Sequence, residues 1–124
     1  MNDIKHVYLD EYNTFLSTYH RGQVSGEEVG EVIVKMASYF AQYNMSMVLA
    51  ERKLALVARD IESRVDEASG KAITSAKAKT FIDATDEAHA YNMERAHTQN
   101  IEQFLNGLKA LQKGVMNEYA HSGA

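Results

Sequence analysis

The sequence predicts an all-α fold: a long, coiled-coil-like antiparallel helical hairpin, with a shorter N-terminal helix that completes a three-helix bundle at its open end. Two observations lead to this prediction. Proline is absent from all 124 residues, so no proline ends or kinks a helix. Apolar residues also recur at alternating spacings of four and three, which is typical of a coiled-coil seam. The seam comprises Val29, Ile33, Met36, Phe40, Tyr43, Met47, Ala50, Leu54, Val57 and Ile61.

A first helix is expected over residues 3–20. Its apolar stripe consists of Ile4, Tyr8, Tyr12, Phe15, Leu16 and Tyr19. Polar side chains such as Asp10 and Glu11 take the opposite face. An amphipathic helix of this length is marginal alone in water, so we expect it to dock on the rest of the chain.

The long helix is expected over residues 26–69. Ser25 is followed three residues later by Glu28, and this Ser-x-x-Glu pattern is a capping box that marks a helix start. Glu27 and Glu28 also place negative charge near the helix N-terminus, where the helix dipole stabilises it. Gly70 is expected to end the helix as a left-handed cap.

A third helix is expected over residues 75–119, capped by Thr74 or Ser75. The connection before it is short, so the second and third helices should run antiparallel. The second half of this helix carries a strong apolar seam, whereas its first half is thin and rich in small residues. We expect the whole chain, residues 1–124, to form one domain.

The open end of the hairpin should hold an aromatic core, whereas the other half, roughly residues 47–91, should consist of two helices only. The expected core contains Tyr8, Tyr12, Phe15, Tyr19, Tyr39, Phe40, Tyr43 and Phe104. Two helices leave apolar side chains uncovered, which predicts a homodimer or higher oligomer. The expected interface is Leu54, Val57, Ile61, Phe81 and Ile82. The alternative is that the long helix kinks near Asn44–Ser46 and folds back on itself.

Composition bounds the class of protein. There is no cysteine, which excludes disulfides and thiolate metal sites and fits a cytoplasmic location. The formal net charge of −4 argues against a general nucleic-acid coat protein. No signal peptide and no apolar run of about 18 residues is visible, so we expect no membrane association. No cofactor motif is present, and no cofactor is expected.

Glu94-x-x-His97 is the first candidate for chemistry. Extending the seam backwards from Ile101 places both residues on the inward face, and the antiparallel register sets Glu51 nearly opposite. A Glu facing a Glu-x-x-His pair is half of a ferritin-like di-iron site, and dimerisation could supply the other half. Salt bridges with Arg52 and Arg95 explain the same charges, so the metal site is the lesser interpretation.

The second candidate is the turn between the long helices, where an anionic ligand such as a nucleotide could bind. Its candidate residues are Lys71, Thr74, Ser75, Lys77 and Lys79, which combine positive charge with a helix N-terminus. The Walker spacing is absent. The alternative, which we favour, is a solvated capping turn whose lysines keep the bend soluble.

The last third of the chain resembles small helical accessory proteins of tailed phages. The residues behind the resemblance are Ile101-Glu102, Leu108-Lys109-Ala110-Leu111-Gln112 and Glu118-Tyr119, after the turn Gly70–Thr74. It implies a short product that acts in the host cytoplasm, and it assigns no catalytic residue. We therefore predict a non-enzymatic, oligomerising binding protein that acts on a host protein or holds an anionic ligand at the turn. The alternative is a ferritin-like metal protein that uses Glu51, Glu94 and His97.

Overall fold

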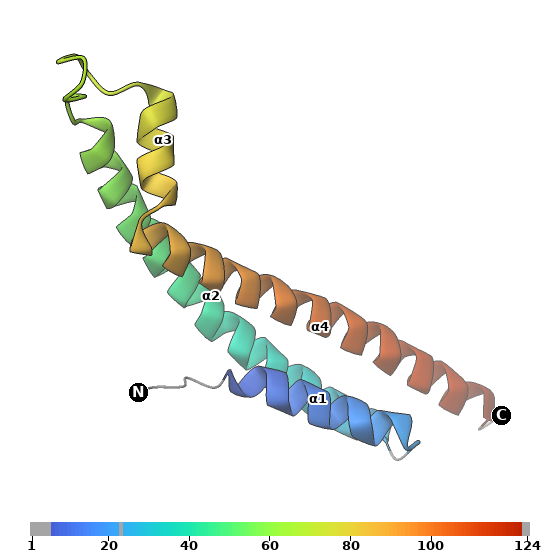
Figure 1. The fold of residues 1–124 in the computed structure, drawn as a ribbon. Coiled ribbons are helices and arrows are strands. Elements are labelled where there is room, and N and C mark those ends of the chain that lie inside the picture. The colour runs from blue at the N-terminus through green and yellow to red at the C-terminus, as the bar shows by residue number, and fades with distance from the viewer. Residues whose placement is uncertain (1–5, 23, 123–124) are drawn as a thin grey trace. The chain divides into compact units, whose positions relative to one another are not determined.

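The computed structural model describes residues 6–22 and 24–122, with side chains described up to residue 115. This part of the chain has four α-helices: α1 (Val7–His20), α2 (Gly26–Glu62), α3 (Ser75–Asp83) and α4 (Asp86–Ser122) (Figure 1). Its only β-pairing is a single antiparallel bridge between Val65 and Ala72. The predicted all-α fold is confirmed. Ile4 and the rest of residues 3–5, expected in the first helix, lie outside the described residues.

The chain forms two compact units, and both long helices contribute to each of them. The first unit comprises residues up to 41 and from 99 onward, and the second comprises residues 42–98. In the first unit, a Cβ atom added at Gly26 would lie 3.6 Å from Val115. In the second unit, the rings of Tyr43 and His97 have centroids 5.5 Å apart. Within each unit α2 and α4 therefore pack together, and they run antiparallel as predicted. That residues 1–124 fold as one domain stays a prediction.

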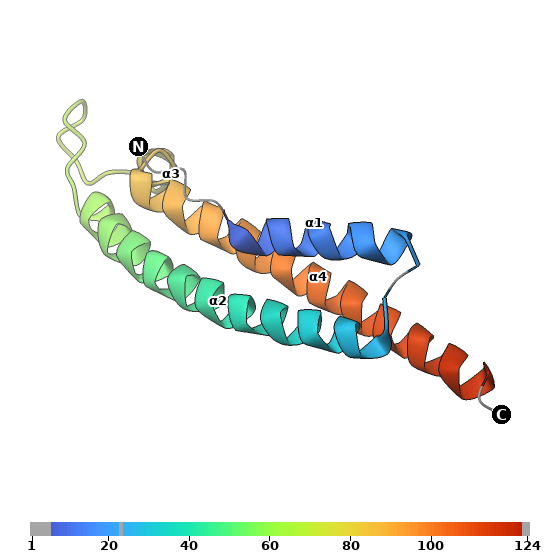
Figure 2. The same cartoon turned by 90° about the horizontal axis from the view of Figure 1, so that it is seen from below.

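The first unit is the predicted three-helix bundle of α1 and the adjoining parts of α2 and α4 (Figure 2). Its buried side chains are Tyr8, Phe15, Val29, Met36, Ile101, Leu105 and Leu108. Tyr12 stacks on Phe104 with ring centroids 3.9 Å apart, which confirms an aromatic core built by α1 and α4. Two expected members differ, since Tyr19 is exposed and Tyr43 belongs to the second unit.

The start of α2 follows the sequence closely. The Ser25 hydroxyl accepts a hydrogen bond from the backbone N–H of Glu28 at 3.2 Å, which is the first half of the predicted capping box. The helix then continues through Asn44–Ser46 to Glu62, so the alternative in which it folds back there is wrong.

The end of α2 differs from the prediction, because the helix stops at Glu62 rather than at residue 69. The Ser63 hydroxyl donates to the carbonyl of Asp60 at 2.7 Å, and Asp66 accepts a hydrogen bond from the N–H of Ala68 at 3.0 Å. Short polar side chains that bond to nearby backbone in this way compete with the helix. Gly70 has the expected positive φ of 69°, but it turns a small hairpin instead of capping the helix.

The predicted third helix is divided in two, because α3 ends at Asp83 and α4 begins at Asp86. The Thr85 hydroxyl donates to the carbonyl of Ile82 at 2.7 Å and accepts from the N–H of Ala88 at 3.1 Å. One side chain thus satisfies groups at the end of one helix and the start of the next. As a result, the second unit contains α3 as a separate short helix beside parts of α2 and α4.

Candidate protein-binding surface

One face of α2 in the second unit is apolar and uncovered. We call it the outer stripe, and it consists of Met45, Val48, Leu49 and Leu56, whose side chains are between 51% and 61% exposed. They follow one another at spacings of three, one and seven residues, which keeps them on one side of a helix. The opposite side holds Ile61, which is only 3% exposed. The helix therefore has an inner seam and an outer stripe.

The predicted oligomer interface combines residues of the inner seam of α2 with two residues of α3, and the structure places part of it inside the unit. Ile61 is buried, and Leu54, Val57 and Ile82 are half-buried. Of the five predicted residues, only Phe81 is largely exposed, at 54%. The prediction is wrong for Ile61 because α3 forms a third helix beside the end of α2 and supplies the buried Ala78.

Sequence reasoning missed the outer stripe, although its signal was present. The spacing from Met45 through Val48 and Leu49 to Leu56 has the same helical period as the seam, on the other side of the helix. Three charged residues, Glu51, Arg52 and Lys53, stand within this stretch, and all three are exposed. They obscured a pattern of apolar residues that is otherwise regular.

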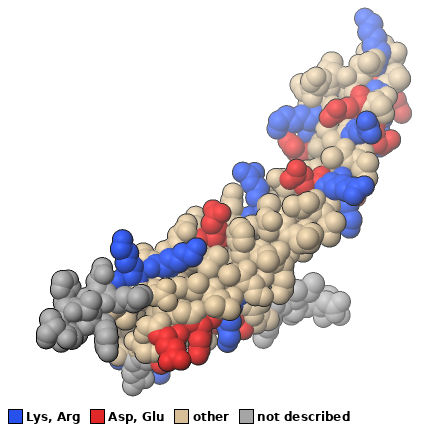
Figure 3. All heavy atoms as spheres, turned by 180° about the vertical axis from the view of Figure 1, so that it is seen from behind, with Lys and Arg blue, Asp and Glu red and all other residues tan. Residues whose placement is uncertain are grey.

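Two of the three lysines predicted to bind an anion form ion pairs with acidic residues of the same chain. The Nζ atom of Lys77 is 2.7 Å from Asp66 Oδ2, and that of Lys79 is 3.1 Å from Asp83 Oδ2. Lys71 is exposed and has no ion pair within the described residues. Figure 3 accordingly shows acidic and basic atoms intermixed at the end of the molecule that carries this turn.

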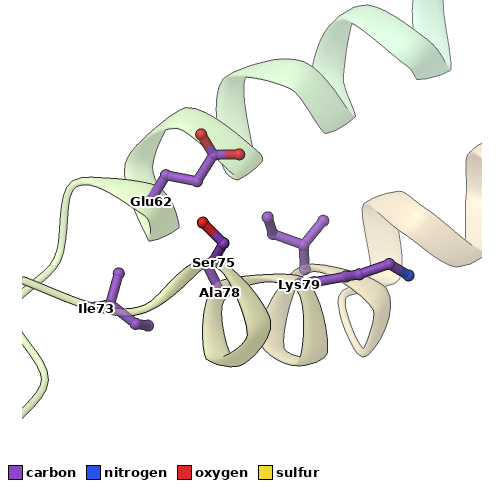
Figure 4. A pocket seen from close by; sticks show the side chains of 6 residues that line it. Glu62, Ile73, Ser75, Ala78 and Lys79 are labelled. Carbon is purple, nitrogen blue, oxygen red and sulfur yellow. The ribbon is translucent and has the colours of Figure 1, made fainter.

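The N-terminus of α3 is also capped by its own chain. The Thr74 hydroxyl accepts from the N–H of Lys77 at 3.3 Å. Next to it lies a cavity of about 450 Å³ between the end of α2 and α3, lined by Glu62, Ser75 and Lys79 among others (Figure 4). In this view the Glu62 carboxylate faces Ser75, whereas the Lys79 side chain extends away from Glu62. A negative group on the rim disfavours an anion, so the solvated capping turn is the better interpretation, and ligand binding there stays a prediction.

Asp66 organises this turn. Its carboxylate accepts from the Lys77 side chain and from the backbone N–H of Ala68, and these two hydrogen bonds lower the pKa of Asp66 below its ordinary value. The backbone N–H of Asp66 donates to the carbonyl of Lys71 at 2.7 Å, and the N–H of Gly70 donates to the carbonyl of Asp66 at 2.7 Å. The turn is thus a hydrogen-bonded hairpin tied to α3.

The predicted metal ligands do not come together as a set. Glu94 and His97 are half-buried on the inward side of α4, as expected, whereas Glu51 is exposed. A cavity of about 300 Å³ in the second unit is lined by Ala50, Lys53 and Glu94 but not by Glu51. Glu51 lies one residue, about 100° of rotation, past Ala50 and so points out of the seam. Among the residues the structure describes, no group of three or more His, Asp or Glu side chains could hold a metal ion.

The first unit has one notable polar contact, between α1 and α2. The Tyr39 hydroxyl donates to Glu11 Oε1 at 2.9 Å, and this hydrogen bond, with burial, raises the pKa of Tyr39. The contact ties α1 to the long helix and stabilises the bundle. Glu11 also lines a groove of about 360 Å³, together with Phe15 and Lys35 among others.

Comparisons with known proteins do not indicate a function, so the function is argued from the surface itself. No protein-family model, curated protein or solved structure matches the chain. The resemblance to small phage proteins therefore stays a prediction. None of the described helices contains a stretch that is both long and apolar enough to cross a bilayer.

Proposed function

We propose that this chain is a non-enzymatic helical protein that associates with itself and acts by binding, with the outer stripe of α2 as its contact surface. The observation that carries the proposal is the exposure of Met45, Val48, Leu49 and Leu56 on one face of one helix. A rigid helix that presents large apolar side chains to solvent is suited to binding another molecule rather than to catalysing a reaction.

The size of the outer stripe supports self-association. Four large apolar side chains, each more than half exposed, amount to a few hundred Å² on one helix face, which is about the size at which patches mark interaction sites. Two copies that bury this surface and its polar margins approach the roughly 1,200 Å² of a specific interface. The oligomer is then the form that engages a host protein, which is one of the two binding targets predicted from the sequence.

Light scattering on the purified chain between about 1 and 100 μM, a range around the affinities of small interfaces, tests the proposal. We expect a mass of two or more chains that falls on dilution. Leu56→Glu should give a monomer with unchanged helix content by circular dichroism. Val7→Glu is the matched control, because Val7 is 50% exposed but lies on α1, which belongs to the first unit and not to the unit that carries the stripe. A wild-type chain that stays monomeric throughout this range overturns the proposal.

A further inference from the structure

Glu51 and Arg52 are neighbouring charges within the span of the outer stripe, and neither has a partner in its own helix. Ion pairs within a helix form between residues three or four apart, as Lys79 and Asp83 do in α3 at 3.1 Å. For Glu51 and Arg52 all such positions are apolar, and the two residues cannot face each other because they are adjacent. The positions are Met47, Val48, Leu54 and Ala55 for Glu51, and Val48, Leu49, Ala55 and Leu56 for Arg52.

Both charges are exposed, and neither forms an ion pair within the part of the chain that the structure describes. Arg52 stands on the face of the outer stripe, between Leu49 and Leu56, and Glu51 stands at the margin of the stripe, about 100° around the helix from Arg52. An unpaired Arg amid exposed Leu and Val side chains is what an interface presents when its acidic partner comes from another molecule.

A second copy of the chain supplies that partner in one orientation only. Most homodimers are two-fold symmetric, so the same patch meets itself. If two outer stripes pack antiparallel, Met45 of one copy meets Leu56 of the other, and the two-fold axis passes close to Glu51. Each Glu51 then lies about 3 Å along the helix axis from the other copy's Arg52, with helix axes about 8–10 Å apart. In a parallel arrangement, Glu51 would face Glu51 and Arg52 would face Arg52.

We propose that the partner of the outer stripe is a second copy of this chain, bound antiparallel through α2, with two symmetric Glu51–Arg52 pairs across the two-fold axis. This inference rests on the proposed function and specifies its contact. The aliphatic part of each Arg52 covers Leu49 of the other copy, while its guanidinium reaches the carboxylate. The charges therefore select the antiparallel orientation, and the apolar side chains supply the affinity.

Charge reversal tests the pairing. Glu51→Arg alone places two pairs of positive charges at the axis, and Arg52→Glu alone places two pairs of negative charges there. We expect each variant to raise the dimer Kd by about tenfold or more, since two favourable contacts become repulsive. A mixture of the two variants should dimerise as the wild type does, because every contact in the mixed dimer again joins opposite charges. The double variant in one chain should also recover wild-type affinity.

Cross-linking tests the orientation separately. The chain has no cysteine, so Met45→Cys and Leu56→Cys introduce single thiols. With a short bismaleimide, a mixture of these variants should cross-link between chains more than either variant alone. Stronger cross-linking within each single variant indicates a parallel dimer and overturns the inference.

The outcomes separate this inference from the function on which it rests. If Leu56→Glu dissociates the oligomer but neither charge reversal weakens it, the pairing is overturned and self-association through the stripe stands. Equal weakness in the mixture and in the separate variants overturns the pairing as well. A monomeric wild-type chain overturns both.

Discussion

Ile61→Ala distinguishes the inner seam of α2 from its outer stripe. Ile61 is 3% exposed in the second unit, and Ala removes most of its buried hydrocarbon. Each buried methylene contributes about 0.8 kcal/mol, and the cavity left behind adds to the loss. We therefore expect the free energy of unfolding to fall by about 2–4 kcal/mol. Because the cover comes from the same chain, the loss should not depend on protein concentration.

The assay is urea denaturation followed by circular dichroism, repeated at several protein concentrations. The matched control is Leu56→Ala, five residues away on the same helix and 60% exposed. It should cost less than about 1 kcal/mol when the copies are dissociated, since a surface change with good helix propensity is nearly neutral. If instead the loss from Ile61→Ala is below about 1 kcal/mol, or disappears on dilution, Ile61 is an interface residue and its intramolecular burial is refuted.

Two further predictions concern glycines and the turn. Gly107→Ala should raise the unfolding free energy by about 1 kcal/mol, because the position is inside α4 and the added Cβ would contact Tyr12 Oη at an ordinary 3.8 Å. Gly70→Ala should lower the unfolding free energy by a similar amount, because the φ angle of Gly70 is 69° and a side chain is strained there. Thermal denaturation of both variants checks these opposite signs, and equal signs would contradict them. The pKa of Asp66 is lowered by Lys77, so the stabilisation from this pair is present above about pH 4 and is lost as the pH falls through the lowered pKa. Asp66→Asn should therefore lower stability at pH 6 and matter little near pH 2, and urea denaturation at both values should show a difference that shrinks towards acid.

The fold was predictable where long-range periodicity and local capping agree. The seam from Val29 to Tyr43 and the Ser25 cap determine the first half of α2. The aromatic stripe of the first helix then has a single apolar surface on which it can pack. Tyr12 on Phe104 and the buried Tyr8 follow from this complementarity. Each of these signals extends over several turns, so no single residue decides the outcome.

The ends and breaks of helices were not predictable by the same means. Thr85, followed by Asp86 and Glu87, is itself a helix-start signature, since a capping hydroxyl precedes two acids. A continuous helix over residues 75–119 also fits the periodicity, because small residues such as Ala84 and Ala88 do not interrupt a helical pattern. Local hydrogen bonds of Thr85 decide between the two, and they amount to only about 1–2 kcal/mol.

The location of the candidate site depends on the division of the predicted third helix at Thr85. Periodicity shows that a helix has an apolar face, but not whether the cover for that face comes from the same chain. The division at Thr85 frees α3 to pack beside the end of α2, and Ile61 becomes core instead of interface. The seam is thus covered within the unit, and the uncovered apolar surface shifts to Met45 and Leu56 on the opposite side of the same helix. A single threonine that ends one helix and starts another thereby contributes to deciding which face of α2 is covered within the unit and which stays exposed.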